Sequence, residues 1–252
     1  MPENSFQGRT IVVSGASSGI GRAVAVQLGQ QGASLVLIAR DRERLEETAR
    51  LAGAPACRIL ELDLTRQSDI MPAINEAAAA VGRLYGLCHA AGTVQTLPLN
   101  ATSPEKLQAM MQVNYFSGVE LARAITRRDI LNEDGGSILF ISAIYGLIGK
   151  PGQVAYSGSK GAVTASARAM AIELARRGIR VNALSPGIVR TEMTDEALSR
   201  LSAEQVQALK DTHPLGFGMP HDVAHAAAFL LSPASKWITG VDLVVDGGCS
   251  AQ

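Results

Sequence analysis

The stretch SGASSGIG at residues 14–21 decides the fold of this chain. It joins a short apolar run to a longer helical pattern. Glycines at these spacings allow a tight turn and a close approach of the backbone to a diphosphate, and the helix that follows offers free N–H groups and the positive end of its dipole. A glycine pattern alone is a weak signal, but this one stands between a strand and a helix, as a dinucleotide-binding loop requires. The stretch therefore predicts such a loop, and the alternative is a structural turn.

Apolar runs of four to six residues, rich in Val, Ile and Leu, alternate with helical patterns along the rest of the chain. Because these runs lack polar alternation, they are typical of strands buried on both faces of a parallel sheet. The β-α-β order implies right-handed crossovers, so we predict an α/β fold with a doubly wound (Rossmann) sheet of seven parallel strands. The predicted strands are Thr10–Ser14, Ser34–Ile38, Arg58–Leu62, Leu84–His89, Ser137–Ser142, Arg180–Leu184 and Asp242–Val245. The predicted helices are Ile20–Gln31, Arg42–Ala52, Gln67–Val81, Pro104–Ile130, Gln153–Arg177 and Asp222–Leu231.

The composition is that of a packed globular protein. The 252 residues contain no linker, so we expect a single domain over residues 1–252. Lys+Arg 23 balance Asp+Glu 23, which gives no support for nucleic acid or an anionic membrane as a partner. No run approaches the ~18 apolar residues of a membrane span. The polar N-terminus and three scattered cysteines fit a protein of the reducing cytoplasm.

One segment, residues 191–220, interrupts the alternation of strands and helices. It is polar, and it is longer than a crossover between two strands needs. We expect a helix around Ala203–Lys210 within it. Long excursions in compact domains often serve as lids or binding loops, so we interpret this segment as a substrate lid, and the alternative is a surface insertion.

The end of the second predicted strand bears on the choice of cofactor. A site that prefers NAD has a carboxylate here for the 2′-hydroxyl of the adenosine. This chain instead has Ala39 followed by Arg40. A guanidinium holds a 2′-phosphate through charge-assisted hydrogen bonds, so we predict NADP(H), and the alternative is a solvated surface arginine. After the third strand, Asp63 either accepts from the adenine amino group or caps the next helix.

Tyr156 and Lys160 are four positions apart in a helical pattern, which places them on one face of a helix. A free tyrosine has a pKa of about 10, too high for a good base near neutrality. A neighbouring ammonium favours the phenolate and lowers that pKa. The pair therefore suits a general acid in reduction and a general base in oxidation.

The chain resembles the short-chain dehydrogenase/reductase family from about Arg9 to Gly248. The matching motifs occur in the family's order. They are SGASSGIG at residues 14–21, HAAG at 89–92, Asn114 in VNY, Tyr156-x-x-x-Lys160, Pro186-Gly187 with Thr191, and DGG at 246–248. The resemblance implies an oxidoreductase in which a hydride passes between a nicotinamide and a carbonyl carbon.

The resemblance also implies roles for individual residues. Tyr156 donates the proton, Lys160 lowers the pKa of Tyr156 and binds the nicotinamide ribose, and Asn114 holds a water that links Lys160 to solvent. Val189 and Thr191 would contact the nicotinamide carboxamide. The cofactor-binding residues that we expect are Gly15, Ser17, Ser18, Gly19, Ile20, Gly21, Arg40, Asp63, Leu64, Ala90, Ala91, Gly92, Tyr156, Lys160, Pro186, Gly187, Val189 and Thr191.

The chain departs from the family's pattern at the fourth catalytic residue. The family has a serine thirteen positions before the tyrosine, and this chain has Ala143 there, with Ser142 one position early. Side chains alternate across a strand, so the Ser142 hydroxyl should point to the opposite side unless a bulge intervenes. Either Ala143 is an engineered substitution that cripples the enzyme, which we favour at this stage, or a natural enzyme uses another donor. A non-catalytic NADP(H)-binding sensor or scaffold is the alternative of a different class.

The likeness is greatest to 3-oxoacyl-(acyl carrier protein) reductases. Arg177 matches one basic position used there for carrier docking, whereas the other holds Asp134, with Arg127 and Arg128 nearby. The substrate is therefore either a carrier-bound or a small free carbonyl compound. The helical patterns over 104–130 and 153–177 and the last strand resemble the family's subunit interfaces, which implies a homotetramer, or a homodimer.

Histidines and metal binding complete the expectations. His89 replaces the first asparagine of the family's Asn-Asn-Ala-Gly motif, and we interpret it as a structural, hydrogen-bonded residue. We judge the remaining three histidines, His213, His221 and His225, not to stand at a metal-binding spacing, so we expect no metal.

Overall fold

In the computed structural model, which describes residues 5–251, seven parallel strands form one sheet. The strands are β1 (Thr10–Ser14), β2 (Ser34–Ala39), β3 (Cys57–Glu61), β4 (Gly86–His89), β5 (Gly136–Ile141), β6 (Ile179–Pro186) and β7 (Asp242–Val245). Their order across the sheet is β3-β2-β1-β4-β5-β6-β7. This arrangement confirms the predicted doubly wound sheet, although residues 1–4 and 252 of the predicted domain lie outside the described residues.

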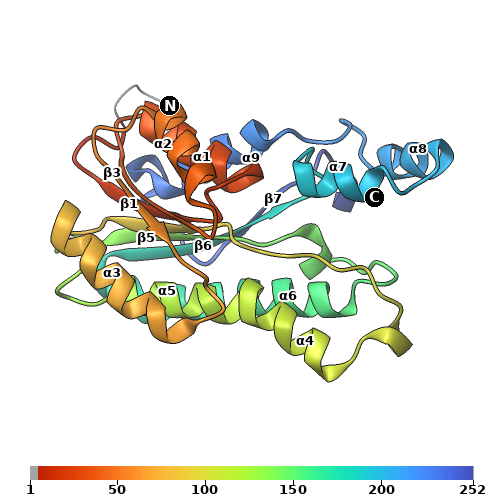
Figure 1. The fold of residues 1–252 in the computed structure, drawn as a ribbon, viewed down its shortest axis with the longest axis horizontal. Helices are drawn as coiled ribbons and strands as arrows, with labels where there is room; N and C mark the ends of the chain where they lie inside the picture. The colour runs from red at the N-terminus through yellow and green to blue at the C-terminus, as the bar shows by residue number, and fades with distance from the viewer. Residues whose placement is uncertain (1–4, 252) are drawn as a thin grey trace.

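Helices cover both faces of the sheet (Figure 1). One layer holds α1 (Gly19–Gln30), α2 (Arg42–Ala52) and α9 (Pro220–Leu231). The other holds α3 (Gln67–Val81), α4 (Pro104–Met111), α5 (Ser117–Ile125) and α6 (Val154–Leu174). Neighbouring strand residues enter opposite cores: Val12 of β1 packs under the α3–α6 layer, and Ile11 and Val13 pack under α1 and α9. A sheet covered in this way needs the continuous apolar runs seen in the sequence.

The strand order reverses between β1 and β4, which are neighbours in the sheet. At such a switch point the connections leave in opposite directions and open a crevice outside the carboxyl ends of the strands, where ligands bind in open α/β sheets. The loop at residues 14–21 follows β1, and residues 90–92 follow β4. The fold therefore places both motifs at the switch point.

The predicted helix over Pro104–Ile130 is wrong in two respects. A π-helical turn (Gln112–Phe116) separates α4 from α5, and α5 ends at Ile125. The helix ends early because the chain turns back to form an isolated parallel bridge between Leu131 and Leu84, which buries both side chains. A local 3.6-residue pattern does not record such a turn, since apolar residues continue through it.

Other boundaries differ by one to three residues. The strand predicted at Leu84 begins at Gly86, the strand predicted to include Ser142 ends at Ile141, and the helix predicted through Arg177 closes in a 3₁₀ turn over Ala175–Arg177. Helix ends commonly tighten in this way.

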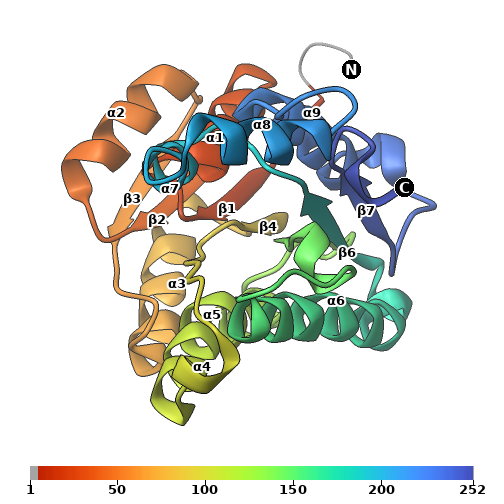
Figure 2. The same ribbon diagram turned by 90° about the vertical axis from the view of Figure 1, so that its right-hand side faces the viewer.

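The segment 191–220 contains two helices, α7 (Glu192–Leu198) and α8 (Ala203–Asp211). The helix expected around Ala203–Lys210 is thus confirmed, and α7 is additional. In Figure 1 both helices extend beyond the sheet on the side where α6 begins, and Figure 2 shows them from that side, across from α4. No helix among residues 5–251 is long and apolar enough to cross a membrane.

Candidate active site

The loop at residues 14–21 leaves no room for side chains at two of its glycines. Gly15 has a φ of +67°, and a Cβ there would lie 2.7 Å from the backbone N of Ala91. A Cβ on Gly21 would lie 2.1 Å from the carbonyl oxygen of Gly15. The first glycine therefore lets the loop pack on the segment after β4, and the second lets α1 pack on the loop.

The N-terminus of α1 faces this loop with its N–H groups uncapped. Ser18 is the N-cap residue, and its side chain makes no capping hydrogen bond. A Cβ placed on Gly19, the first helical residue, would lie 3.2 Å from Thr191, so the start of the segment 191–220 lies against the same helix end. Free N–H groups and absent side chains fit a dinucleotide diphosphate.

Two arginine side chains donate hydrogen bonds to the loop at residues 14–21. The carbonyl oxygen of Ser17 accepts from Arg22 at 2.7 Å and from Arg44 at 3.3 Å. Arg44 also donates to both carboxylate oxygens of Glu192, at 2.5 and 2.6 Å. This second contact joins α2 to the first residue of α7. Arg44 and Glu192 lie 148 positions apart, so no local pattern in the sequence indicates their contact.

On the adenosine side, Arg40 is exposed directly after β2 and makes no ion pair or hydrogen bond with another residue of the range 5–251. Asp63 accepts from the backbone N–H and hydroxyl of Thr65, at 3.0 and 2.8 Å, and these bonds, with Arg40 nearby, lower its pKa. The alternative in which Asp63 caps the next helix is wrong, because Arg66 is the N-cap of α3. Leu64 is buried in the core.

Tyr156 and Lys160 lie in the first two turns of α6, with the Lys160 Nζ 5.7 Å from the centre of the tyrosine ring. Lys160 is buried and donates to the carbonyl oxygen of Ile141 at 2.8 Å. Burial lowers the pKa of Lys160 to about 8 and raises the pKa of Tyr156 to about 12, with a smaller rise from Tyr145. The protein residues alone therefore keep Tyr156 protonated, and desolvation, not the charge of Lys160, dominates its pKa.

Asn114 lies in the π-helical turn between α4 and α5. Its amide group donates to Thr93 O at 2.9 Å and to Ser159 Oγ at 3.0 Å, and its oxygen accepts from Thr93 N–H at 2.8 Å. A Cβ on Gly92 would lie 3.4 Å from Asn114 Oδ1 and 3.5 Å from Lys160 Nζ. The fold thus brings Gly92, Asn114 and Lys160 together, and π-helical turns are frequent at functional sites.

Ser142 and Ala143 lie where β5 meets the turn before α6. The Ser142 hydroxyl donates to Lys160 O at 3.1 Å and pairs with Thr164 Oγ1 at 3.0 Å. Ala143 is buried, with extended backbone (φ −166°, ψ 154°), so no bulge reverses the alternation of the side chains. The Ser142 hydroxyl is directed at α6, and position 143 carries no donor.

His89 is buried under the cofactor loop. Its Nδ1 hydrogen-bonds with Ser14 Oγ at 2.8 Å, and the same oxygen accepts from Ala91 N–H at 3.3 Å. Burial, followed by the charge of Lys160, lowers the pKa of His89 to about 3, so the ring is neutral. Ala90 N–H donates to Ser14 O at 3.2 Å, and both contacts tie β4 to β1 at the switch point.

The loop after β6 is held by a histidine whose role the sequence did not reveal. Ile188 N–H donates to His213 Nε2 at 3.2 Å, so the ring proton sits on Nδ1, which lies 3.0 Å from Leu209 O. Val189 forms an isolated bridge with Gly218, and Gly187 packs on Asp246. His213 therefore fastens the end of α8 to the segment 186–191 that follows Pro186.

Two observations bear on metal binding. No group of three or more His, Cys, Asp or Glu side chains within residues 5–251 could hold a metal ion. His221 and His225 lie one helical turn apart on α9 with ring centres 6.0 Å apart, so their spacing alone does not exclude a metal, contrary to the sequence interpretation.

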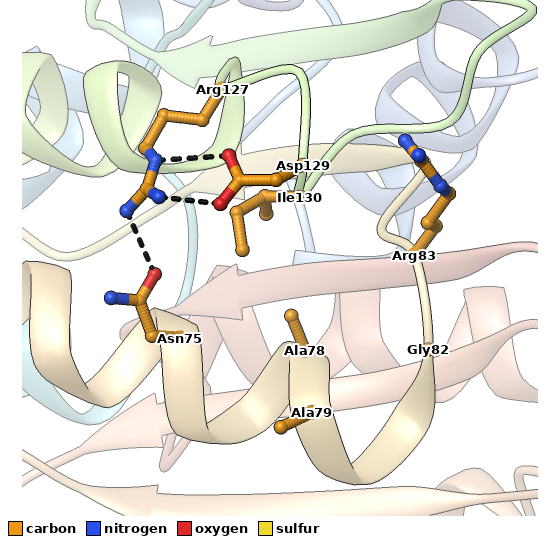
Figure 3. Close-up of a pocket in the computed structure, with 8 residues that line it drawn as sticks. All are labelled: Asn75, Ala78, Ala79, Gly82, Arg83, Arg127, Asp129 and Ile130. Atoms are coloured by element: carbon orange, nitrogen blue, oxygen red, sulfur yellow. Dashed lines mark hydrogen bonds and ion pairs between the residues drawn. The ribbon is translucent and has the colours of Figure 1, made fainter.

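A pocket of about 410 Å³ lies away from this site, between α3 and the turn after α5 (Figure 3). In it Arg127 pairs with Asp129 at 2.5 Å and donates to Asn75 Oδ1 at 3.0 Å. Arg177, on the neighbouring turn, donates to Thr126 O at 2.5 Å. Two of the basic residues considered for carrier docking are therefore engaged in contacts within the chain.

Comparison with known proteins identifies the family. The family described as "Enoyl-(Acyl carrier protein) reductase" matches residues 15–250. The chain is 36% identical to the human 3-oxoacyl-[acyl-carrier-protein] reductase over 241 residues, which cover 95% of this chain and 97% of that protein. A short-chain type dehydrogenase/reductase from Mycobacterium ulcerans superposes with a TM-score of 0.91 at 31% identity, over 98% of this chain and 91% of that one. Carveol dehydrogenase from Mycobacterium avium, solved in complex with NAD, superposes with a TM-score of 0.92 at 26% identity, over 99% and 100%.

The fold and these matches define an oxidoreductase built on a dinucleotide-binding sheet. The chain belongs to the short-chain dehydrogenase/reductase family, acts on CH–OH or C=O groups and uses a nicotinamide dinucleotide.

Proposed function

We propose that this protein is an NADPH-dependent reductase that converts a ketone or 3-oxoacyl-type carbonyl to an alcohol. The observation that carries the proposal is the meeting of Tyr156, Lys160 and Asn114 beside Gly92, at the carboxyl ends of β4 and β5. That position adjoins the loop whose glycines and free helix N–H groups fit the diphosphate.

The residues divide the chemistry between them. When bound, the nicotinamide supplies the hydride that adds to the carbonyl carbon. The Tyr156 hydroxyl gives its proton to the carbonyl oxygen, which completes the alcohol and leaves a phenolate to be reprotonated from solvent. Lys160 stabilises that phenolate through its positive charge, and Asn114 is positioned to order a water beside Lys160.

The preference for NADPH rests on Arg40. Arg42 pairs with Glu61 and Glu46, and Arg44 pairs with Glu192, whereas Arg40 has no partner among residues 5–251. An exposed, unpaired guanidinium directly after β2 is free to bind a 2′-phosphate, and no carboxylate stands at position 39 to repel it.

The substrate is either a carrier-bound 3-oxoacyl group or a small free ketone. The human relative is named for a carrier-bound substrate. The contacts of Arg127 and Arg177 within the chain favour a free substrate, because neither guanidinium is wholly available to an acidic carrier.

A homotetramer and a cytoplasmic location complete the proposal. Large apolar side chains exposed on α6 and before β7 support self-association, since Ile172 is 79% and Trp237 97% exposed. All three cysteines are free, which suits a reducing compartment.

The function is tested by measuring oxidation of NADPH and NADH with acetoacetyl-coenzyme A and a simple ketone as probes. We expect turnover with NADPH, and none in Tyr156→Phe although that variant still binds NADPH. Arg40→Ala should weaken NADPH binding by about 10-fold to 100-fold and leave NADH binding nearly unchanged. Equal affinity of the parent for both cofactors contradicts the NADPH assignment, and substantial activity in Tyr156→Phe contradicts the role of Tyr156.

A non-catalytic NADP(H)-binding sensor is the second candidate, favoured only by Ala143. It predicts that the parent binds NADPH but reduces no carbonyl probe.

A further inference from the structure

At the family's catalytic positions, only Tyr156 offers a hydrogen-bond donor to the reacting carbonyl oxygen. Negative charge grows on that oxygen in the transition state, and Tyr156 supplies one hydrogen bond to it. Ala143 has no polar atom, and the Ser142 hydroxyl is bonded to Lys160 O and Thr164 on α6. Another group must supply the bond, or the reaction is slow.

Tyr145 lies two residues after Ala143, in the 3₁₀ turn Ile144–Gly146. The turn is fixed against α6 because a Cβ on Gly146 would lie 3.0 Å from both Lys160 C and Gly161 N. The phenol of Tyr145 is half-buried and lies near enough to Tyr156 to contribute to the raised pKa of that residue. A phenolic O–H is therefore held on a turn that packs against Lys160, on the segment where the family carries its serine.

Lys150 orients and polarises this phenol. Its Nζ donates to Tyr145 Oη at 3.0 Å and lies 4.8 Å from the centre of the ring. Because the ammonium donates, the hydrogen of the Tyr145 hydroxyl remains available, and the phenol becomes a stronger donor. Within residues 5–251 the Tyr145 hydroxyl has no other hydrogen bond, so its donor capacity is unused.

We propose that Tyr145, polarised by Lys150, donates the second hydrogen bond to the reacting carbonyl oxygen, in place of a serine at position 143. The bond is a hydrogen bond only: the proton that is transferred still comes from Tyr156. This inference rests on the proposed function and takes the second explanation of Ala143, in which a natural enzyme uses another donor.

The test measures reduction of acetoacetyl-coenzyme A by NADPH in the parent, Tyr145→Phe and Ala143→Ser, with Tyr85→Phe as the matched control. Tyr85 also loses one phenol, but it bonds Leu231 O away from the site. We expect Tyr145→Phe to lower kcat by about 10²–10³-fold with little change in KM, because a transition-state bond is lost. Lys150→Met should lower kcat in the same direction but by less. Ala143→Ser should recover most of the loss in Tyr145→Phe, and in the parent it should raise kcat by far less than about 10²-fold.

The opposite pattern overturns the inference. If Tyr145→Phe matches Tyr85→Phe while Ala143→Ser raises kcat by about 10²-fold, position 143 is simply defective. If Ser142→Ala is the crippling variant, Ser142 is the donor.

A measurement without substrate or cofactor separates this inference from the proposed function. In an NMR titration of tyrosines labelled at Cζ, Tyr145→Phe should let Tyr156 begin to ionise at lower pH than in the parent, because one cause of its raised pKa is gone. An unchanged titration overturns the placement of Tyr145 even if the parent reduces no probe. A parent that reduces no probe but shows the shift contradicts the proposed function and, with it, the catalytic role of Tyr145.

Discussion

Lys160 is charged at neutral pH in a place where burial opposes the charge. The only hydrogen bond of its ammonium group within residues 5–251 goes to Ile141 O, and desolvation lowers its pKa from 10.5 to about 8. Below pH 8 the folded and unfolded chains both hold the proton, so the cost of burying the ammonium is fully present. Between about pH 8 and 10.5 only the unfolded chain holds it, and the free energy of unfolding therefore rises with pH. A lysine kept at such a cost suits a catalytic function better than a structural one.

We predict that, without cofactor, Lys160→Met is more stable than the parent at pH 7 and that this advantage shrinks as the pH rises from 8 to 10. Urea unfolding at a series of pH values measures it. The difference between variant and parent cancels the contribution of the Cys57 and Cys88 thiols, whose raised pKa values lower stability above pH 9 in both proteins. Lys210→Met, on the exposed face of α8, is the control and should show no such trend. A parent that is the more stable protein throughout this range contradicts the prediction.

At the scale of elements, the first residue of α7 joins this helix to the loop at residues 14–21. Thr191 caps α7 by accepting from Thr194 N–H at 3.2 Å, and Glu192 pairs with Arg44, which also holds Ser17. The pair is exposed and therefore weak. We propose that so weak a contact lets α7 and α8 open and then close over the loop at residues 14–21.

We predict that residues 191–211 exchange amide hydrogens rapidly without ligand and more slowly with NADPH. Glu192→Gln should speed the exchange of α7 severalfold at most and weaken NADPH binding, because the link to Arg44 is lost. Glu196→Gln is the matched control, since Glu196 pairs with Arg200, two residues after the end of the same helix. Exchange that is slow without NADPH and unchanged by it would mean that this segment is not a lid.

At the scale of the whole molecule, two regions carry large apolar side chains that are mostly exposed. One includes Ile172 on α6, and the other includes Trp237 before the edge strand β7. Side chains of this size are costly to leave in water over a continuous area, so such surfaces commonly form interfaces between subunits.

We predict a homotetramer in sedimentation velocity experiments. Ile172→Asp and Trp237→Asp should each produce dimers, and the two together should produce monomers. The reason is that a tetramer with D2 symmetry needs two different interfaces. Leu51→Asp, which changes an apolar residue that is 50% exposed on α2, is the control and should stay tetrameric. A parent that sediments as a monomer contradicts the assembly.

Local patterns in the sequence determined the sheet and the position of the cofactor loop. The strand Thr10–Ser14 was predicted with the observed bounds, because burial on both faces leaves a continuous apolar run in the sequence. The glycines of residues 14–21 and the spacing of Tyr156 and Lys160 are equally local, since each depends on a turn or on one helical face.

The tertiary structure alone decided which distant side chains meet. It placed Arg44 on Glu192, His213 under Ile188, and the Lys150 ammonium on the Tyr145 hydroxyl. It also ended α5 at Ile125, where the chain turns to pair Leu131 with Leu84. Periodicity records how each segment is buried, but contacts between segments depend on how the elements cross, and that geometry exists only after the whole chain has packed.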